Sequence, residues 1–356
     1  MSAKPLVFIA LSGGVDSAVA ALRLIDQGFR VVGIHMETWK DPKWLDITSI
    51  ASAVLAKSAA DSIGVPFVSL DVRDVFFQRV IRTFVNSYLA GMTPNPCLFC
   101  NPQIKWGILQ TYALEQGGDY FATGHYARLT TGEDGLVRLL RGVDTTKDQS
   151  YVLSMLSQFQ LRYSLLPLGG MTKTEVRRQA QALKLLVADH EDSQDLCFLG
   201  GGDYRDFLQR YAPESTAPGE IVDMNGKVLG RHQGLAFYTI GQRRGIQIAA
   251  SKPYYVVDKD IYNNRLMVGF AEQATKSQLQ ATQPNYITGE IPQAGEIFDV
   301  MIRYRAQPVK GELLLASQEE FRLKFKQELR GMTPGQVAVL YQGEVCLGGG
   351  IIQTAW

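Results

Sequence analysis

The chain has 356 residues, of which 46% are hydrophobic and 20% are charged, and its formal net charge is +1. This composition is ordinary for a soluble globular protein, and the length predicts two or three domains. The small net charge excludes a strong bulk attraction to polyanions, so nucleic-acid contacts would have to come from local clusters such as Arg243-Arg244 and Arg303-Tyr304-Arg305.

The first predicted element is a buried strand at Leu6–Leu11. This apolar run is too short to span a bilayer and is not followed by the cleavage site of a signal peptide. We therefore expect a cytoplasmic protein with no membrane partner.

Up to about residue 200, short apolar runs alternate with amphipathic stretches of helical length. Gly28 is expected to end the first helix. This alternation predicts an α/β fold with a doubly wound parallel sheet and right-handed crossovers. The expected strands are Leu6–Leu11, Arg30–Met36, Phe67–Leu70 and Tyr120–Thr123, and the expected helices are Ser17–Gln27, Ile47–Ile63, Val72–Leu89 and Ile104–Gln116.

Beyond residue 200, turn residues separate short runs that are rich in Val, Ile and Tyr. One helix is predicted at Asp203–Arg210, and Asn225-Gly226 is a two-residue hairpin signal. The remaining runs predict an antiparallel sheet or small barrel. We expect an α/β domain over residues 1–200, a small central α+β domain over 201–275 and a β-barrel-like domain over 276–356. The expected strands include Tyr254–Val257, Leu266–Val268, Ile297–Tyr304, Glu312–Leu315, Phe321–Phe325, Gln336–Leu340 and Val345–Ile352.

A glycine-rich turn, Ser12-Gly13-Gly14-Val15-Asp16-Ser17, joins the first strand to the first helix. Glycines let backbone N–H groups approach an anion closely, and the helix N-terminus adds about half a positive charge. Asp16 cannot attract phosphate directly, so we expect it to act through a bridging Mg²⁺. A plain turn capped by Ser12 or Asp16 is the alternative, but the complete string favours phosphate binding.

This string resembles the signature of the PP-loop, or N-type ATP pyrophosphatase, superfamily. Members of that superfamily use ATP to adenylate a carbonyl or carboxyl oxygen and release pyrophosphate. The resemblance implies adenylation but leaves the acceptor open.

Three of the four cysteines lie in distinctive segments. Cys97 and Cys100 follow the proline-rich Thr93–Pro96, just ahead of the helix expected from Ile104, and Cys197 lies further along. A thiol near a helix N-terminus has a lowered pKa and is more reactive.

Three interpretations of these cysteines remain open. In the first, the cysteines are small hydrophobic side chains buried in the core, and Cys346 fits this interpretation well. The second is thiol chemistry, in which one cysteine carries or attacks sulfur and another resolves the product. The third is a zinc site, disfavoured because the chain has no second Cys-x-x-Cys. Its ligands would be Cys97, Cys100, Cys197 and His190.

Together with the phosphate loop, these segments resemble the tRNA-specific 2-thiouridylases over nearly the whole chain. The resemblance implies an ATP-dependent sulfurtransferase that adenylates the C2 oxygen of the uridine at the first anticodon position. Sulfur then replaces this oxygen, giving 2-thiouridine, AMP and pyrophosphate. The motifs are Ser12–Ser17, Met36, Thr93–Cys100, Thr123–Tyr126, Lys147–Ser150, Asp192–Leu199, Gly241–Gly245 and Arg303–Arg305.

The resemblance also implies roles for individual residues. Cys100 would be the nucleophile and Cys197 the persulfide carrier, leaving a Cys100–Cys197 disulfide that an external reductant opens. Cys97 stands where some relatives have an acid/base Asp, so its role would be acid/base or auxiliary, and it ranks below Cys100 and Cys197. ATP would be held by Ala10, Leu11, Ser12, Gly13, Gly14, Val15, Asp16, Ser17, Met36 and Gly124, the target base by Asn95, Pro96 and Cys97, and tRNA by His125, Lys147, Asp148, Gln149, Arg303, Tyr304 and Gln336.

The same resemblance implies ATP and Mg²⁺ but no permanent cofactor. Expected partners are the tRNAs for Lys, Glu and Gln and a persulfide donor, either a cysteine desulfurase or a sulfur-relay protein. Two other functions remain open, namely another adenylating enzyme of the amide-forming or ligase type and a zinc-stabilised RNA-binding protein. The segment Gly241–Gly245 fits a basic hairpin or a tRNA contact equally well, and His35, His190 and His232 receive no role.

Overall fold

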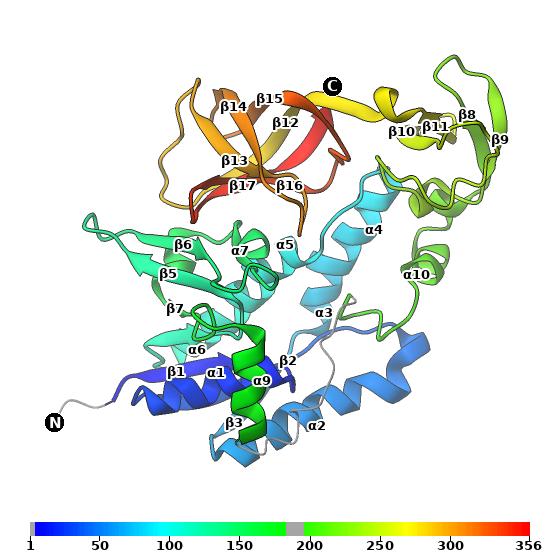
Figure 1. Ribbon diagram of the computed structural model, residues 1–356. Coiled ribbons are helices and arrows are strands. Elements are labelled where there is room, and N and C mark those ends of the chain that lie inside the picture. Colours follow the sequence, from blue (N-terminus) through cyan, green and yellow to red (C-terminus); the bar gives the residue numbers. More distant parts are fainter. Residues whose placement is uncertain (1–3, 183–195) are drawn as a thin grey trace.

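The computed structural model describes residues 4–182 and 196–356, which are built around three sheets (Figure 1). The first sheet has five parallel strands in the order β3-β2-β1-β4-β7, which confirms the predicted α/β class. Its strands are β1 Leu6–Ala10, β2 Arg30–Glu37, β3 Phe67–Asp71, β4 Tyr120–Ala122 and β7 Ser164–Leu165.

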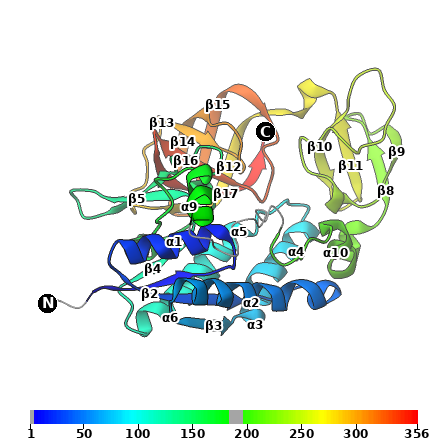
Figure 2. The ribbon, with the colours of Figure 1, turned by 60° about the horizontal axis from the view of Figure 1, so that its bottom comes forward.

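Helices cover both faces of this sheet (Figure 2). The alternation of side chains along β1 explains why, because Val7 and Ile9 join the core on one face and Phe8 joins the core on the other. On the first face lie α1 Val15–Asp26, α2 Leu45–Ile63, which follows η1 Pro42–Trp44, and α9 Lys173–Ala182.

The opposite face carries two long helices, each interrupted by a π-helical segment. The second helix begins at Cys97, so the predicted start near Ile104 is wrong. The Asn95 side chain explains the early start, because its Oδ1 accepts a hydrogen bond from the Cys97 backbone N–H at 3.1 Å. The segments are α3 Arg73–Phe76, η2 Phe77–Ile81 and α4 Arg82–Leu89 in the first helix, and α5 Cys97–Cys100, η3 Asn101–Leu109 and α6 Gln110–Glu115 in the second.

A small central sheet follows, in the order β10-β11-β8-β9. The hairpin predicted at Asn225-Gly226 joins β8 to β9, with Gly226 at a φ of +83°. Its elements are α10 Tyr204–Tyr211, η4 Pro213–Thr216, β8 Gly219–Val222, β9 Val228–His232, η5 Leu235–Phe237, β10 Tyr255–Asp260, β11 Arg265–Gly269 and η6 Ala271–Ala274.

The third sheet closes into a barrel because β12 pairs with both β15 and β17. The long strand β12 was not predicted from the sequence. A further hairpin, β5 Ala127–Thr131 and β6 Val137–Arg141, joins this sheet through β17, with Cys346 opposite Leu139. The barrel strands are β12 Thr275–Tyr286, β13 Ile297–Met301, β14 Val309–Ala316, β15 Glu320–Arg330, β16 Val337–Gln342 and β17 Val345–Ala355.

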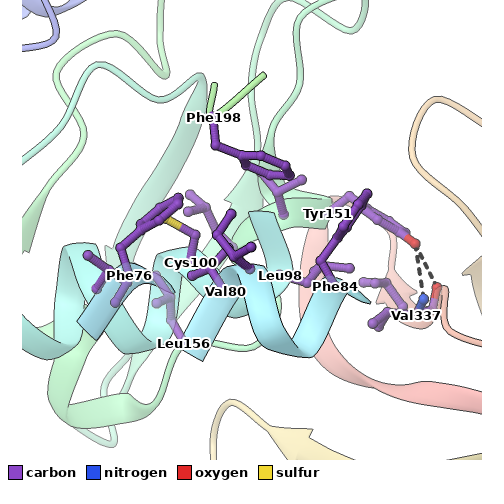
Figure 3. Close-up of a cluster of buried hydrophobic side chains, with 14 of the residues drawn as sticks. Phe76, Val80, Phe84, Leu98, Cys100, Tyr151, Leu156, Phe198 and Val337 are labelled. Atoms are coloured by element: carbon purple, nitrogen blue, oxygen red, sulfur yellow. Dashed lines mark hydrogen bonds between the residues drawn. The ribbon is translucent and has the colours of Figure 1, made fainter. Parts of the chain in front are cut away.

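Two short helices, α7 Ser150–Leu153 and α8 Gln158–Arg162, lie between the first sheet and the barrel. The Tyr151 hydroxyl donates to the backbone oxygen of Val337 at 2.9 Å, which fixes α7 to the barrel (Figure 3). Among the described helices, none is long and apolar enough to cross a membrane.

Candidate active site

The phosphate loop lies where the order of the parallel strands reverses. The chain builds β1, β2 and β3 in one direction and then places β4 on the other side of β1. Ligands of doubly wound sheets bind in the crevice at such a point, beyond the carboxyl ends of the strands. The loop after β1 and the turn after β4, which contains Gly124, both lie there. The fold thus brings together the segments that the sequence assigned to ATP.

The loop geometry requires its first glycine. Gly13 has a φ of +81°, and a Cβ atom at this position would lie 2.7 Å from Cβ of Leu55. The Ser17 hydroxyl donates to the backbone oxygen of Gly14 at 2.9 Å, which fixes the turn to the start of α1. Gly124 packs against the same helix, because a Cβ there would lie 3.0 Å from the carbonyl carbon of Asp16.

The Asp16 carboxylate has two side-chain partners. The Lys173 ammonium lies 2.7 Å and 2.8 Å from its two oxygens, and the Tyr126 hydroxyl donates to Oδ1 at 2.7 Å. Lys173 is only 8% exposed and stands in the first turn of α9. Neither partner was predicted from the sequence. A reciprocal pair between Thr172 and Glu175 caps this helix, and this pattern predicts where α9 begins but not that Lys173 meets Asp16.

Carboxylates alone do not build a metal site at this loop. In residues 4–182 and 196–356, no group of three His, Cys, Asp or Glu side chains is arranged to hold a metal ion. Asp16 can therefore offer at most one carboxylate to a cation that phosphates and water also hold, which is the usual way Mg²⁺ accompanies nucleotides. The zinc interpretation finds no support among the described ligands, and His190 lies outside the described residues.

Cys100 is the last residue of α5, and its side chain is buried in the core. It is 8% exposed and lies with Phe76 and Phe198 in one cluster of apolar side chains (Figure 3). Burial, with smaller contributions from the thiols of Cys197 and Cys97, raises the pKa of Cys100 to about 12. Because Phe198 lies in the same apolar cluster as Cys100, the fold brings together segments that are almost 100 positions apart in sequence.

Cys197 and Cys97 remain accessible to solvent, and all four cysteines carry free thiols. The surrounding protein raises the pKa of Cys197 to about 11 and also raises the pKa of Cys97. The expectation that a helix N-terminus lowers the pKa of Cys97 and Cys100 is therefore wrong, because desolvation outweighs the helix dipole here. Cys346 is buried in β17, as the interpretation of a small hydrophobe predicted.

Lys40 lowers the pKa of Cys197, and a second cation, Lys105, opposes the upward pKa shifts of all three thiols. Lys105 lies five residues after Cys100 in the π-helical segment η3, where residues five apart follow one another along the same face. Four neighbouring side chains feel this charge. Burial has the largest effect on the pKa of each, and the positive charge of Lys105 lowers the pKa of all four. They are Cys97, Cys100, Cys197 and His125. Lys105 was not predicted from the sequence, because its place beside the thiols depends on the π-helical geometry of η3.

Phe198 anchors the segment that carries Cys197. Its ring packs at centroid distances of 5.3 Å from Phe84 and 5.6 Å from Phe207. Its backbone oxygen accepts a hydrogen bond from the N–H of Asp41, whose fully buried carboxylate pairs with Arg210. The backbone next to Cys197 is therefore fixed beside the apolar cluster that contains Cys100. Asp192–Asp195, the first part of the predicted motif, lies outside the described residues.

The barrel holds the segment that was predicted to grip the target base. Gln336 donates through Nε2 to the backbone oxygen of Thr93 at 2.7 Å, and the Thr93 N–H donates to the oxygen of Pro334 at 2.9 Å. Asn95 caps the helix of Cys97 through its side chain. Two predicted ligand-binding residues, Gln336 and Asn95, thus also have structural partners.

Two other predicted RNA-binding side chains have partners within the protein. Asp148 accepts from the backbone N–H groups of Gly142 and Ser150, each at 3.0 Å, and Gln149 accepts from the Tyr126 N–H at 2.9 Å. These bonds fix the loop after β6, on which Lys147 stands.

Three further predicted residues flank the site. His125 shares a hydrogen bond with the Thr123 hydroxyl at 2.8 Å, and burial holds its pKa well below the ordinary value, so the ring is neutral. The Tyr304 ring packs 5.8 Å from that of Tyr151, and Arg303 beside it is exposed.

The two other histidines that the structure describes have structural partners. His35 forms a buried hydrogen bond with the backbone oxygen of Leu11 at 2.8 Å. His232 accepts from the backbone N–H of Gly234 at 3.0 Å. Both contacts support local backbone structure, in keeping with the absence of an assigned role.

Comparison with known proteins places this arrangement in a family. A family model described as the tRNA methyl transferase HUP domain matches residues 5–201, the PRC-barrel domain of the same name matches 205–270, and an aminomethyltransferase beta-barrel domain matches 276–352. The structure of an NMN synthetase from Francisella tularensis is similar over 58% of this chain and 73% of that chain, with a TM-score of 0.36 and 15% identity.

Curated relatives match over nearly their full length. The tRNA-specific 2-thiouridylase MnmA of Carboxydothermus hydrogenoformans is 44% identical over 98% of this chain and 97% of the relative. Its namesake from Moorella thermoacetica is 43% identical over 97% of this chain and 99% of the relative. The chain therefore belongs to the family of tRNA-specific 2-thiouridylases.

Proposed function

We propose that this chain is a tRNA 2-thiouridylase that uses ATP to activate the C2 oxygen of the uridine at the first anticodon position and replaces it with sulfur. The observation that carries this proposal is the convergence of Cys100 and Cys197 beside Lys105, next to a PP-loop nucleotide site. Family membership and the name of the full-length relatives support the same activity.

The phosphate loop would perform the activation step. The uridine oxygen attacks the α-phosphorus of ATP, pyrophosphate leaves, and an adenylate becomes the leaving group on C2. Backbone N–H groups at the start of α1 favour the phosphates, and the ammonium of Lys173 adds positive charge beside Asp16. Mg²⁺ would accompany ATP, with Asp16 contributing one carboxylate oxygen.

The two cysteines would perform the sulfur step. A donor loads Cys197, whose accessible thiol suits this exchange, as a persulfide. The terminal sulfur attacks C2, and AMP leaves. Attack of the Cys100 thiolate on the Sγ atom of Cys197 then releases 2-thiouridine and forms a disulfide, which a two-electron reductant opens. In the alternative order, Cys100 attacks first and releases hydrosulfide, which attacks C2.

Lys105 would support both the persulfide and the thiolate. Burial keeps Cys100 and Cys197 protonated at neutral pH, so a positive charge beside them favours the reactive anions. A low-water environment also protects the adenylate from hydrolysis. Cys97, the third thiol beside this cation, has no step of its own in this scheme.

The RNA contacts would come from the exposed Arg303 and the half-buried Lys147 and Tyr304, which offer charge and a ring. Asp148 and Gln149 fix the loop that carries Lys147. The tRNAs for Lys, Glu and Gln are the expected substrates. The persulfide donor would be a cysteine desulfurase or a sulfur-relay protein.

The decisive experiment incubates the protein with ATP, Mg²⁺, a persulfide source and unmodified tRNA, followed by mass analysis of the nucleosides. We expect 2-thiouridine from the wild type and from C346S, and none from C100S or C197S. An amide-forming or ligase-type enzyme would keep its adenylating activity in both serine variants. Absence of 2-thiouridine from the wild type would overturn the proposal.

A further inference from the structure

A basic cavity of about 270 Å³ lies between the central sheet and the barrel, which stand next to each other in Figure 1. We call it the arginine pocket. Three of its lining residues are arginines that come from three separate segments of the chain. The lining residues are Gly241, Arg243, Tyr255, Arg303, Arg330 and Gly331.

Two glycines bring these segments together. Gly241 has a φ of +84°, and a Cβ atom on it would lie 2.8 Å from the Cα atom of Gly331. Gly331 has a φ of +79°, and a Cβ atom there would lie 3.3 Å from Nη1 of Arg303. The Gly241 N–H donates to the oxygen of Val256 at 2.8 Å, which fixes this turn to β10. The close approach of two backbones therefore creates the pocket.

Among the described residues, no acidic side chain forms an ion pair with Arg243, Arg303 or Arg330, so none of these residues neutralises the positive charge of the pocket. The guanidinium of Arg330 lies over the ring of Tyr255 at 5.0 Å, which holds it in place without reducing its charge. Convergent guanidinium groups match the oxygens of a phosphate, which they bind through paired N–H donors.

The pocket is fixed relative to the segment that is predicted to grip the target base. Gly331 begins a short loop that ends at Gln336 and whose Thr333 hydroxyl donates to the oxygen of Ile240 at 3.4 Å. The other end of this loop holds Thr93 through the bonds from Gln336 and to Pro334. One loop thus forms a wall of the pocket and positions the chain just before Asn95.

We propose that the arginine pocket binds a backbone phosphate of the tRNA, close along the strand to the target uridine. This inference rests on the proposed function, and it assigns to Arg243, Arg330 and Tyr255 a site that sets the register of the RNA. All three arginine-bearing segments are open to solvent, which suits a polymer that enters from outside. Phosphate contacts position a nucleic acid without reading its sequence.

The test measures tRNA affinity as a function of salt for R243A and R330A. The control is K326A, which removes an exposed charge from the same strand as Arg330. Each arginine variant should bind tRNA about tenfold more weakly and lower the slope of log affinity against log salt by about one. K326A should keep the slope, and thermal melting checks that all three variants fold.

A glycine pair tests the geometry of the pocket independently of its charge. G241A should weaken tRNA binding because the new Cβ separates the two backbones. G226A carries a similar backbone strain in a hairpin turn with no heavy atom within 4 Å, and it should bind normally. Equal tRNA affinities of G241A and G226A would contradict the proposed role of the pocket.

Other outcomes separate this inference from the proposed function. Wild-type salt slopes in both arginine variants, with 2-thiouridine still formed, would overturn the pocket alone. If R330A lowers the salt slope of tRNA binding but the wild type forms no 2-thiouridine, the proposed function is overturned and the pocket is not. If inorganic phosphate raises the melting temperature of the wild type but not of R330A while tRNA binding is equal, the pocket binds small anions and the inference fails.

Discussion

The two halves of the active site are specified in different ways. The phosphate loop is six consecutive residues, which we propose to act through backbone N–H groups, and its turn requires the φ of +81° at Gly13. The cysteine site is assembled from the first turn of α5, the segment around Phe198 and a cation in η3, and burial sets its acidity. A local motif can thus be predicted from its amino-acid sequence, whereas the properties of a site assembled from distant segments depend on packing.

The largest expected effect tests the local character of the loop. G13A places a Cβ 2.7 Å from the Cβ of Leu55 and forces a residue with a side chain into a φ of +81°. We expect tRNA-dependent release of pyrophosphate to fall about 100-fold, since a strain of about 1–3 kcal/mol distorts the phosphate site. Alkylation of Cys197 should stay at the wild-type rate.

The matched control for this variant is G28A. Gly28 has a φ of +89° at the end of α1, but a Cβ there meets nothing within 4 Å. Its stability should fall modestly while pyrophosphate release is retained. Equal losses of activity in G13A and G28A would show that general instability, and not the loop, explains the result.

The second prediction tests whether the cysteine site depends on packing. F198A removes a ring that contacts Phe76, Phe84 and Phe207, and a Phe-to-Ala change in a core costs about 3–5 kcal/mol. We expect Cys197 to lose its fixed position, so that formation of 2-thiouridine falls more than pyrophosphate release. F198L, which keeps most of the volume, should be intermediate. Equal losses of the two activities in F198A would contradict this prediction.

The third prediction concerns the charge of Lys105. K105M removes the positive charge that lowers the pKa of Cys100 and Cys197, so the thiolate fraction at a given pH should fall. Single-turnover formation of 2-thiouridine should slow about tenfold for each pKa unit of change. K105R should restore the rate, and the rates of K105M and the wild type should rise in parallel with pH, because both thiol pKa values lie above the range tested. A K105R deficit as large as that of K105M would show a purely structural role.

The same contrast explains what could be predicted from the sequence. The parallel sheet, the loop and the Asn225-Gly226 turn follow from hydrophobic period and glycine chemistry, which are local properties. The start of the cysteine helix was misplaced because Pro94 and Pro96 suggested a loop, whereas the Asn95 side chain caps the helix.

The parts that could not be predicted depend on contacts between distant segments. Lys173 meets Asp16 across 157 positions, and no local pattern announces that pair. The raised pKa of Cys100 depends on its burial beside Phe198, which only the packed core defines. The strand β12 also escaped prediction, because its polar residues conceal the two pairings that close the barrel.

The smallest expected effect compares directly the two thiols that we propose to be catalytic. Iodoacetamide should modify Cys197 before Cys100, because Cys197 is accessible and its pKa, about 11, is below the value of about 12 for Cys100. Both rates should rise about tenfold per pH unit from pH 7 to 9 without a plateau, since the thiolate reacts and both pKa values lie above this range. Mass analysis of the two peptides measures each rate.

The same shifts give stability a direction with pH. The folded protein holds these thiol protons more tightly than the unfolded chain, in which a thiol has a pKa of about 8.5. Stability should therefore be unaffected below about pH 8 and fall progressively as the pH rises towards 11, and the double variant C100S/C197S should lose part of this dependence. A plateau in the alkylation rate of Cys100 near pH 8 would show that its pKa is not raised. The positive charges of Lys105 and of the helix N-terminus would then outweigh burial, and the acidity of the cysteine site would no longer depend on packing.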